Sequence, residues 1–526
     1  MELDLSTQAR MVEALQRPEA FDHPADPLQH LQTHISHVLL AGDYAYKIKK
    51  PLDLGFLDFS TLERRRFCCE EELRLNRRLA ERIYLGVVPI TGSVEAPRFG
   101  GGGEVLDYAV RMRRFPQDAL LSRRGPAPAI IDRIADRAAE FHAAIPAAAS
   151  DAPYGDPEAV FFPMQQNFDQ IRPLLGDDAR ELARLDPLEA WTGERYRSLH
   201  DLLGARKAEG HVRECHGDMH LGNIALVDGQ VVIFDGIEFN PDLRWIDVMN
   251  EAAFLVMDLE QAGHAGLARR FLNRWLERTG DYAGLPLLDF YKVYRALVRA
   301  KVTAIRLAQP DLPAAERTSV LAEYGRYVAL AEGYIQPRGA RLILTHGLSG
   351  SGKTRLGQAL LEATPLIRIR SDVERKRLFG LAAEARTGAP LEGGIYTPEA
   401  GRRTYARLRE LARPVLAAGY PVLVDATFLR AGDRKAFAAL AREEGVPWTL
   451  LDLEAPLEIL EARVAGRLTE GSDASEAGIE VLHRQAATRD PLDPEEIRHA
   501  VRLDTSEAPD AAGLAAVVAE LSAKGT

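Results

Sequence analysis

The chain has 526 residues, of which 46% are hydrophobic and 27% are charged, and its formal net charge is −11. At roughly 150 residues per domain, this length predicts two to four domains. The composition is that of a globular protein and excludes a disordered chain. The acidic balance disfavours a general nucleic-acid binder, and no window holds the ~20 uninterrupted apolar residues of a membrane span. The acidic start lacks signal-peptide features, and the three cysteines fit neither a disulfide framework nor a zinc site, so we expect a cytoplasmic protein.

The first part of the chain predicts a small lobe that carries a sheet, followed by a larger helical lobe. A charged helix is expected at 62–81, and helices dominate the later part up to residue 335. The four glycines at 100–103 are typical of a hairpin loop between two strands. Strands first and helices afterwards favour an α+β arrangement. The strand-like runs lie at 38–40, 44–49, 84–90 and 105–111.

Turn-forming residues at 332–340 separate this part from a second one. We therefore place the domain boundary after residue 335, with one domain over 1–335 and the other over 336–526. In the second domain strands and helices alternate, which predicts an α/β fold with a doubly wound parallel sheet. Strands are expected at 342–345, 366–369, 421–425 and 448–452, and helices at 353–362, 398–417 and 432–444.

The densest group of reactive side chains is CHGDMHLGN at 215–223, followed by VVIFDGIEF at 231–239. Phosphoryl transfer needs a carboxylate for the proton of the acceptor hydroxyl, oxygen ligands for magnesium, and a cation for the nucleotide phosphates. Asp218 and Asn223 lie five residues apart in a polar loop and can supply the base and one metal ligand. Asp235 follows a β-branched strand and precedes a glycine, so its carboxylate can reach a metal from the strand end. A polar turn with incidental acids is the structural alternative.

This order of motifs resembles the HxDxxxxN and DFG elements of protein kinases. It is closer to the HGDxHxxN loop of aminoglycoside phosphotransferase-like kinases, and the resemblance covers roughly residues 30–300. It implies a bilobal protein-kinase-like fold that uses ATP and Mg²⁺. YKIKKPLDLGFLDFSTLERR is similar to a bacterial group in which this kinase module is fused to a P-loop module. The acceptor does not carry over, because antibiotic-modifying and metabolic kinases share the loop.

Upstream, AYKIKK at 45–50 predicts a strand whose alternation puts Lys47 and Lys49 on one face. Its first three residues resemble the A-x-K of the kinase strand whose lysine meets the nucleotide phosphates, which implies Lys47 with Lys49 as the alternative. The helix at 62–81 offers Glu72 as the paired acid, with Glu70 and Glu71 as competitors. A solvated helix face is the alternative for any one of these glutamates.

Two further features bear on this resemblance. Where the glycine-rich loop of a kinase is expected, the segment Thr33–Asp43 has a single glycine, which weakens the nucleotide contact. Asp247, in RWIDVMNE, resembles the buried acid that orients the catalytic loop in such kinases, and an ordinary helix-start acid is the alternative.

The second domain carries GLSGSGKT at 347–354, which fits G-x-x-x-x-G-K-[ST] between a predicted strand and a predicted helix. The glycines, Gly347, Gly350 and Gly352, let successive backbone N–H groups converge on a β-phosphate at a helix N-terminus. Lys353 is expected to reach the β- and γ-phosphate oxygens, and the hydroxyl of Thr354 to bind magnesium.

Two acids follow other strands of this domain. Asp425 ends a buried strand and is predicted to act in the magnesium shell, in the Walker B role. Asp372 lies just after the second strand, at the sheet edge where α/β proteins bind ligands. It resembles the acid of P-loop polynucleotide-kinase, zeta-toxin and gluconate-kinase relatives that receives an acceptor hydroxyl. An N-cap for a helix at 373–379 is the alternative.

Basic residues surround these acids. Arg463 and Arg467 lie four apart on one predicted helix, as in a kinase lid that neutralises the transferred phosphate, with a surface salt-bridge helix as the alternative. A second basic group could hold an anionic acceptor or be a solvated charged stretch. Its members are Arg370, Arg375, Lys376 and Arg377.

The sequence therefore predicts a bacterial fusion of two ATP-dependent kinase modules, the second of the AAA, zeta-toxin and polynucleotide-kinase type. Each module is expected to transfer the γ-phosphate of ATP–Mg²⁺ to a hydroxyl of a small-molecule acceptor. Asp218 is the candidate base of the first module and Asp372 that of the second. The alternatives are an ATP-binding regulatory protein with one inactive module and, through the second module, a nucleic-acid end kinase.

Overall fold

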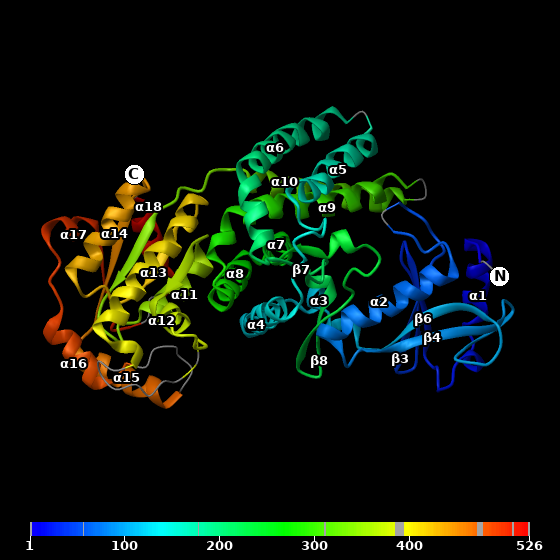
Figure 1. The fold of residues 1–526 in the computed structure, drawn as a ribbon, viewed down its shortest axis with the longest axis horizontal. Coiled ribbons are helices and arrows are strands. Elements are labelled where there is room, and N and C mark those ends of the chain that lie inside the picture. The colour runs from blue at the N-terminus through cyan, green and yellow to red at the C-terminus, as the bar shows by residue number, and fades with distance from the viewer. Residues whose placement is uncertain are drawn as a thin grey trace. The chain divides into compact units, whose positions relative to one another are not determined.

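The computed structural model describes residues 3–55, 57–176, 178–309, 312–383, 385, 394–470, 477–507 and 510–523, and the side chains of 314 and 467–470 lie outside this description. The chain forms two compact units, coloured from blue to red along the chain in Figure 1. The first unit comprises Met1–Asp178 with Gly193–Leu259. The second comprises Ala179–Thr192 with Glu260–Thr526.

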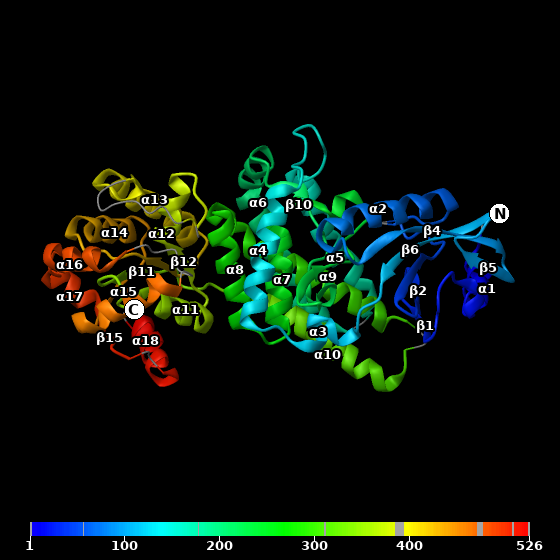
Figure 2. The ribbon, with the colours of Figure 1, turned by 90° about the horizontal axis from the view of Figure 1, so that it is seen from below.

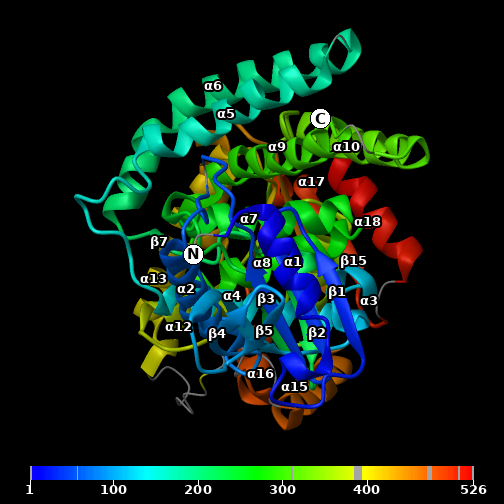
Figure 3. The same ribbon diagram turned by 90° about the vertical axis from the view of Figure 1, so that its right-hand side faces the viewer.

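The first unit opens with a six-stranded antiparallel sheet in the order β1-β2-β3-β6-β4-β5. Helix α1 (Leu5–Ala14) packs its apolar side chains against this sheet. Figure 3 shows the ribbon of this helix together with the strands. Helix α2 (Leu62–Ala80) begins at the N-cap Thr61 and contacts β4 and β6. The strands are β1 (Leu28–Gln32), β2 (Ser36–Ala41), β3 (Tyr44–Lys49), β4 (Tyr84–Ser93), β5 (Ala96–Phe99) and β6 (Val105–Arg113).

Helix α2 buries three polar side chains, Arg65, Glu72 and Asn76, among the apolar residues of its buried face. Its buried residues recur every three to four positions, which places them on one side of the helix. Arg65 pairs with Asp107 of β6 at 2.8 Å, and both side chains are almost fully buried. Glu72 and Asn76 lie on this same buried side of the helix.

The prediction of a hairpin at the four glycines was wrong. Residues 100–103 connect β5 to β6, and β4 lies between these two strands in the sheet. The ten-residue strand β4 is long enough to pair with β6 over most of its length and with β5 at its end. The glycine segment therefore crosses from one side of β4 to the other.

The rest of the first unit is mainly helical and contains two small two-stranded sheets that frame the loop at 215–223. Strand β7 precedes that loop and β8 follows it. The elements are α3 (Leu121–Arg124), α4 (Pro128–Ala144), α5 (Pro157–Leu175), the shared helix α6 (Ala179–Ala208), β7 (Val212–Glu214), β8 (Ile224–Val227), β9 (Gln230–Ile233), β10 (Trp245–Asp247) and α7 (Val248–Gln261).

The second unit contains a five-stranded parallel sheet in the order β12-β13-β11-β14-β15. Its central strands are buried along their whole length, as expected for strands covered on both faces. Figure 2 shows α11 and α18 on one face and α13 and α14 on the other. The strands are β11 (Leu342–His346), β12 (Ile367–Arg370), β13 (Val422–Asp425), β14 (Trp448–Glu454) and β15 (Ala500–Asp504).

The helices of this unit include three that precede the parallel sheet in the chain. These are α8 (Ala265–Thr279), α9 (Leu288–Leu307) and α10 (Ala314–Tyr334). Those that follow are α11 (Lys353–Ala363), α12 (Ser371–Leu378), α13 (Pro398–Ala417), α14 (Ala431–Glu443), α15 (Leu457–Glu470), α16 (Ile479–Thr488), α17 (Pro494–His499) and α18 (Ala511–Ala523). The elements predicted between 342 and 452 are confirmed within two residues, whereas β15 was not predicted.

Helix α8 covers the free edge of the parallel sheet. The side-chain amide of Asn273 donates to the carbonyl of Leu366 at 3.1 Å, and its oxygen accepts from the backbone N–H of Arg368 at 2.7 Å. The hydroxyl of Tyr282 donates to the carbonyl of Arg368. These bonds satisfy backbone groups of the edge strand β12 that would otherwise lack a partner.

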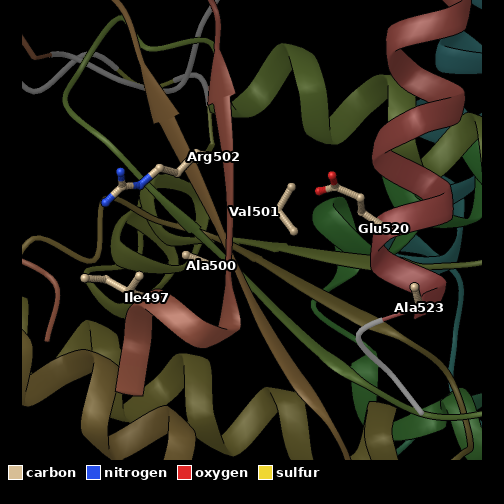
Figure 4. A pocket seen from close by; sticks show the side chains of 6 residues that line it. All are labelled: Ile497, Ala500, Val501, Arg502, Glu520 and Ala523. Atoms are coloured by element: carbon tan, nitrogen blue, oxygen red, sulfur yellow. The ribbon is translucent and has the colours of Figure 1, made fainter. Parts of the chain in front are cut away.

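Among the described residues, none of the helices combines the length and apolar character needed to cross a membrane. All three cysteines are buried and free. A cavity of about 450 Å³ lies between β15 and α18 (Figure 4). It is lined by Ile497, Ala500, Val501, Arg502, Glu520 and Ala523, none of which belongs to the predicted sites.

Candidate phosphoryl-transfer sites

Both lysines of strand β3 bind the same acid of helix α2. Lys47 Nζ lies 3.0 Å from Glu72 Oε1, and Lys49 Nζ lies 2.7 Å from Glu72 Oε2. Glu70 instead pairs with Arg66 at the surface, and the partly buried Glu71 pairs with Arg74 and Arg244. Of the three glutamates left open by the sequence, Glu72 is therefore the one that the fold brings to the lysines.

The two lysines differ in what else they contact. Lys47 binds Asp235 at 2.5 Å, and the Asp235 side chain is 46% exposed. Lys49 forms an ion pair with Glu238, and these two side chains are only 1% and 4% exposed. Lys47 therefore lies at the open side of the network, where a nucleotide phosphate can reach it, whereas Lys49 is enclosed beneath.

The charges of this network control one another. Burial alone would favour a neutral Glu72, yet the two ammonium groups lower its pKa to about 2. The neighbouring carboxylates likewise outweigh burial at Lys47 and hold its pKa well above the usual value. Glu72 and Lys47 are thus both charged near neutral pH, as a phosphate-binding lysine requires.

The loop between β7 and β8 brings Asp218 and Asn223 together. The Asn223 side-chain amide donates to Asp218 Oδ2 at 2.9 Å and to the Asp218 carbonyl at 3.0 Å. His220 Nε2 lies 3.4 Å from the same carboxylate oxygen. The Asp218 side chain is 36% exposed, so its carboxylate is oriented by the loop and still open to an acceptor.

Buried acids hold this loop by its backbone. The N–H of Gly217 donates to Glu251 at 2.7 Å, and the N–H of Leu221 donates to Asp258 at 2.8 Å. The other oxygen of Glu251 is hydrogen-bonded to His142. Burial alone would raise the pKa of Glu251, but the bond and charge of His142 outweigh it, so the pKa is lowered.

Of the two interpretations of Asp247, the structure favours the acid at a helix start. Asp247 ends strand β10, its Oδ1 accepts from the N–H of Met249 in the first turn of α7 at 2.8 Å, and its carboxylate binds the buried guanidinium of Arg206 at 2.6 and 2.8 Å. Glu251 lies one turn into α7 and is the acid that contacts the backbone of the loop, at Gly217. The two acids are four residues apart, and the change from strand to helix between them decides which one faces the loop.

Asp235 occupies a strained backbone conformation. Its φ is +63°, in the left-handed region that aspartate tolerates better than most residues. The hydroxyl of Tyr84 accepts from its N–H, and Asn76 of α2 accepts from the N–H of Gly236 at 2.8 Å. These bonds fix the turn, so the carboxylate of Asp235 is directed to Lys47 and away from the strand.

The carboxylates and the amide of this site are the hard oxygen donors that Mg²⁺ prefers. Asn223 and Asp235 follow the loop and strand β9 in the order predicted, and the carbonyl of Asn223 accepts from the N–H of Phe234. The residues present therefore fit an ATP–Mg²⁺ site with Asn223 and Asp235 as ligands. The turn between β1 and β2 contains no glycine, and Gly42 lies at the next turn instead.

The phosphate loop of the second unit has the predicted geometry. Gly347, Gly350 and Gly352 have φ values of +144°, +83° and +84°, which side chains rarely adopt. A Cβ atom at Gly347 would lie 2.6 Å from the carbonyl oxygen of Leu453. Lys353 Nζ donates to the carbonyls of Gly347 and Leu348, so the ammonium is held at the loop that it is expected to serve.

Thr354 and Asp425 meet at the end of the central strands. Thr354 Oγ1 donates to Asp425 Oδ2 at 3.0 Å. Arg370 Nε lies 3.9 Å from the same oxygen and its Nη1 lies 3.7 Å from Glu277 of α8. A hydroxyl and a carboxylate in contact beside a P-loop fit a magnesium site, and Arg370 limits the negative charge there.

Asp372 does not cap a helix, so that alternative was wrong. Helix α12 begins at Ser371, which places Asp372 inside the first turn, and residue 370 occupies the N-cap position. Asp372 makes no hydrogen bond or ion pair within the part of the chain that the structure describes. Its half-buried carboxylate is therefore available at the carboxyl edge of β12.

Of the two arginines predicted on helix α15, the structure describes the contacts of Arg463 only. Arg463 of α15 donates to the carbonyls of Thr505 and Ser506 at 2.7 and 2.9 Å, and to Gly350 at 3.5 Å. It thus ties α15 to the phosphate loop by backbone contacts. The side chain of Arg467 lies outside the described residues.

Comparison with known proteins gives two family matches, one in each part of the chain. Residues 68–288 match the model of the phosphotransferase enzyme family, and residues 342–492 match that of the AAA domain. Proteins of Mycobacterium tuberculosis (strain H37Rv) and Mycobacterium bovis, both called uncharacterised, are 31% identical over 462 residues, or 86% of this chain and 89% of theirs. The chain belongs to their family. In this chain the phosphotransferase match precedes the match to the AAA domain.

Separate solved structures resemble the first and the second part of the chain. A choline/ethanolamine kinase family protein of Mesorhizobium loti is 14% identical, with a TM-score of 0.37 over 62% of this chain and 99% of that one. A gluconokinase of Sinorhizobium meliloti is 22% identical, with a TM-score of 0.25 over 36% of this chain and 99% of that one. The first part of the chain has the protein-kinase-like fold of phosphotransferases, and the second is a P-loop sheet.

Proposed function

We propose that the protein is a double phosphotransferase, in which each module transfers the γ-phosphate of ATP to a hydroxyl of a small-molecule acceptor. The observation that carries the proposal is a pair of contact sets from distant segments: Lys47 binds Glu72 and Asp235, and Asn223 binds Asp218. The two sets are joined through the backbone, because the N–H of Phe234, next to Asp235, donates to the carbonyl of Asn223 at 3.0 Å. The second module supports it with the contact between Thr354 and Asp425 beside a P-loop. We place the functional boundary at residues 335 and 336.

In the first module Lys47 binds the nucleotide phosphates while Glu72 holds its ammonium group in position. Asp218 accepts the proton of the acceptor hydroxyl as the hydroxyl oxygen bonds to the γ-phosphorus and the bond to the bridging oxygen of ADP breaks. Asn223 and Asp235 hold Mg²⁺, which when bound neutralises charge on the β- and γ-phosphates. Asn223 also keeps the Asp218 carboxylate in one orientation through its 2.9 Å hydrogen bond.

In the second module the backbone of the loop at 347–352 binds the β-phosphate at the N-terminus of α11. Lys353 binds the β- and γ-phosphate oxygens, and Thr354 and Asp425 hold Mg²⁺. Asp372 accepts the proton of a second hydroxyl at the carboxyl edge of β12. The three buried, free cysteines fit the reducing cytoplasm in which we place the protein.

The test is ATP-dependent phosphorylation of a metabolite extract, read by mass spectrometry. Asp218→Asn is expected to lower the formation of one product about 10²- to 10⁴-fold, because the general base is lost. Lys353→Ala is expected to abolish a different product. Matched controls are Asp201→Asn and Lys435→Ala, whose side chains are 108% and 68% exposed and which should leave both products unchanged.

The outcomes separate the proposal from its alternatives. Two products, each lost in one variant, support two active modules. Products that depend on only one of the two residues mean that the other module is regulatory. Phosphorylation confined to RNA or DNA ends would replace the small-molecule acceptor of the second module by a nucleic acid.

A further inference from the structure

Helix α12 carries the candidate base of the second module together with a group of basic residues. Asp372 lies in its first turn, and Arg375, Lys376 and Arg377 follow, with Arg370 just before the helix. The sequence left open whether these cations bind an anionic acceptor or are merely solvated. The contacts of each cation show whether the protein itself supplies its partner.

Three of the four cations are already engaged by the protein. Arg370 lies between Glu277 and Asp425, at 3.7 and 3.9 Å. Lys376 is buried and donates to the carbonyl of Ala383 at 3.0 Å. Arg377 forms an ion pair with Glu374 and donates to the carbonyl of Glu277.

Arg375 differs from them in having no acid partner within the described part of the chain. Its guanidinium lies over the ring of Tyr396, 5.1 Å from the ring centre. Its Nε is buried and donates no hydrogen bond. A buried charged N–H without an acceptor is uncommon in folded proteins, and a bound ligand is one of the few reasons to retain it.

The surroundings of Arg375 are those of an acceptor site. Arg375 lies three residues after Asp372, so both project from neighbouring positions of one helix face. Helix α12 packs against α13, whose Tyr405 hydroxyl accepts from the N–H of Phe428 and lies 3.5 Å from the Thr427 hydroxyl. Thr427 follows Asp425 by two residues, which puts these hydroxyls at the end of β13. Burial raises the pKa of Tyr405, and the positive charge of Arg375 is among the influences that oppose this rise.

We propose that the acceptor of the second module carries an anionic group, a carboxylate or a phosphate, and that Arg375 binds it. This inference rests on the proposed kinase function of that module. The planar guanidinium can bind either anion through two parallel hydrogen bonds, which fixes the acceptor in one orientation. A hydroxyl of the same molecule then meets Asp372, its oxygen bonds to the γ-phosphorus, the bond to the bridging oxygen of ADP breaks, and its proton passes to Asp372.

The first experiment identifies the acceptor of the full-length protein. Products that form from a metabolite extract with wild type but not with Lys353→Ala are identified by mass spectrometry. The acceptor is expected to bear a carboxylate or a phosphate. Treating the extract beforehand with alkaline phosphatase distinguishes them, because only a phosphate-bearing acceptor disappears. A neutral acceptor overturns the inference but leaves the kinase function standing, whereas the absence of any Lys353-dependent product overturns both.

The second experiment tests Arg375 itself. Arg375→Met is expected to raise the KM for the acceptor about 10- to 100-fold, the range for losing a hydrogen-bonded charge, with a much smaller change in kcat. Arg375→Lys should recover part of the loss. Arg403→Met is the matched control, because Arg403 also lies over a ring, that of Phe379, but is exposed. A KM unchanged by Arg375→Met would overturn the inference.

A binding measurement makes the test independent of turnover. Inorganic phosphate and, separately, acetate are titrated into full-length protein saturated with a non-hydrolysable ATP analogue and Mg²⁺, so that the γ-phosphate position is filled. At least one anion is expected to bind wild type and Arg403→Met about tenfold more tightly than Arg375→Met. Binding that does not depend on Arg375 for either anion would contradict the proposal.

Discussion

Lys49 and Glu238 form an ion pair that joins strand β3 to the segment after Asp235, and the two side chains are 1% and 4% exposed. The residues are 189 positions apart in the chain. Because Lys49 also binds Glu72, one buried ammonium group connects the sheet, helix α2 and the segment that follows the turn at Asp235. Lys47 is thereby left to face the open side of the site.

Loss of one partner of this pair should destabilise the first unit. Lys49→Met leaves the buried carboxylate of Glu238 without its cation, and breaking a buried pair in this way costs about 3–5 kcal/mol. The double variant Lys49→Met/Glu238→Gln is expected to lose clearly less than the sum of the single losses, because the paired charges depend on each other. Chemical denaturation of wild type, Lys49→Met, Glu238→Gln and the double variant measures this coupling.

The exposed pair of Arg10 and Glu95 is the matched control, with side chains 63% and 68% exposed. Arg10→Met should change stability by less than about 1 kcal/mol. Additive losses at Lys49 and Glu238 would show that their contact contributes little.

Glu72→Gln should impair the first module while Glu70→Gln should not. Glu72 orients both lysines, and a misplaced catalytic group can cost about 100-fold in rate. Glu70 lies on the exposed side of the same helix, where it pairs with Arg66. Its variant therefore controls for a Glu→Gln change that does not touch the two lysines. The measurement is the rate of the Asp218-dependent product. Equal rates in the two variants would remove Glu72 from the account.

The histidines in the hairpin of β1 and β2 should make the stability of the folded protein sensitive to acid. His30 and His37 are hydrogen-bonded at 3.0 Å, and burial with the nearby Lys50 lowers both pKa values, that of His37 to about 4. In the unfolded chain both titrate near 6.5, so the unfolded state binds more protons below that pH. Stability should therefore fall as the pH decreases from about 6.5 to about 4.

Thermal melting of wild type and His37→Gln across this range measures the effect. His37→Gln should flatten the pH dependence, whereas His34→Gln, at an exposed position in the adjacent turn, should leave it as in wild type. The same slope in all three proteins would place the titrating groups elsewhere.

The edge of the parallel sheet makes a prediction about fragments. Asn273 and Glu277 of α8 bind the backbone and side chain of Arg368 on the edge strand β12. A fragment of residues 336–526 lacks α8 and exposes that edge, so we expect it to associate or precipitate. A fragment of residues 260–526 should remain monomeric in size-exclusion chromatography. A stable monomer of the shorter fragment would show that α8 is dispensable for the sheet.

The sequence predicted what depends on local order. The P-loop, its flanking strand and helix, and the loop with Asp218 and Asn223 are short motifs in which neighbouring residues act together. Partners from distant segments could not be read in this way. Glu238 stood within the quoted segment at 231–239, yet only the fold brings it to Lys49. Glu277 likewise meets Arg368 from 91 positions away.

The choice between Asp247 and Glu251 shows the same limit at short range. Both lie in one stretch of sequence, and only the end of β10 and the start of α7 determine which one faces the loop at 215–223. Lys47 and Lys49 were left as alternatives because the alternation of a strand does not show how deeply each side chain is buried. The structure uses both, one at the open side and one enclosed.

The central claim is that one chain holds two separate nucleotide sites. Its most direct test is calorimetric titration of a non-hydrolysable ATP analogue with Mg²⁺ into wild type, Lys47→Ala, Lys353→Ala and the double variant. The account predicts two sites in wild type, one in each single variant and none in the double variant. A single site in wild type, lost entirely with either lysine alone, would contradict it.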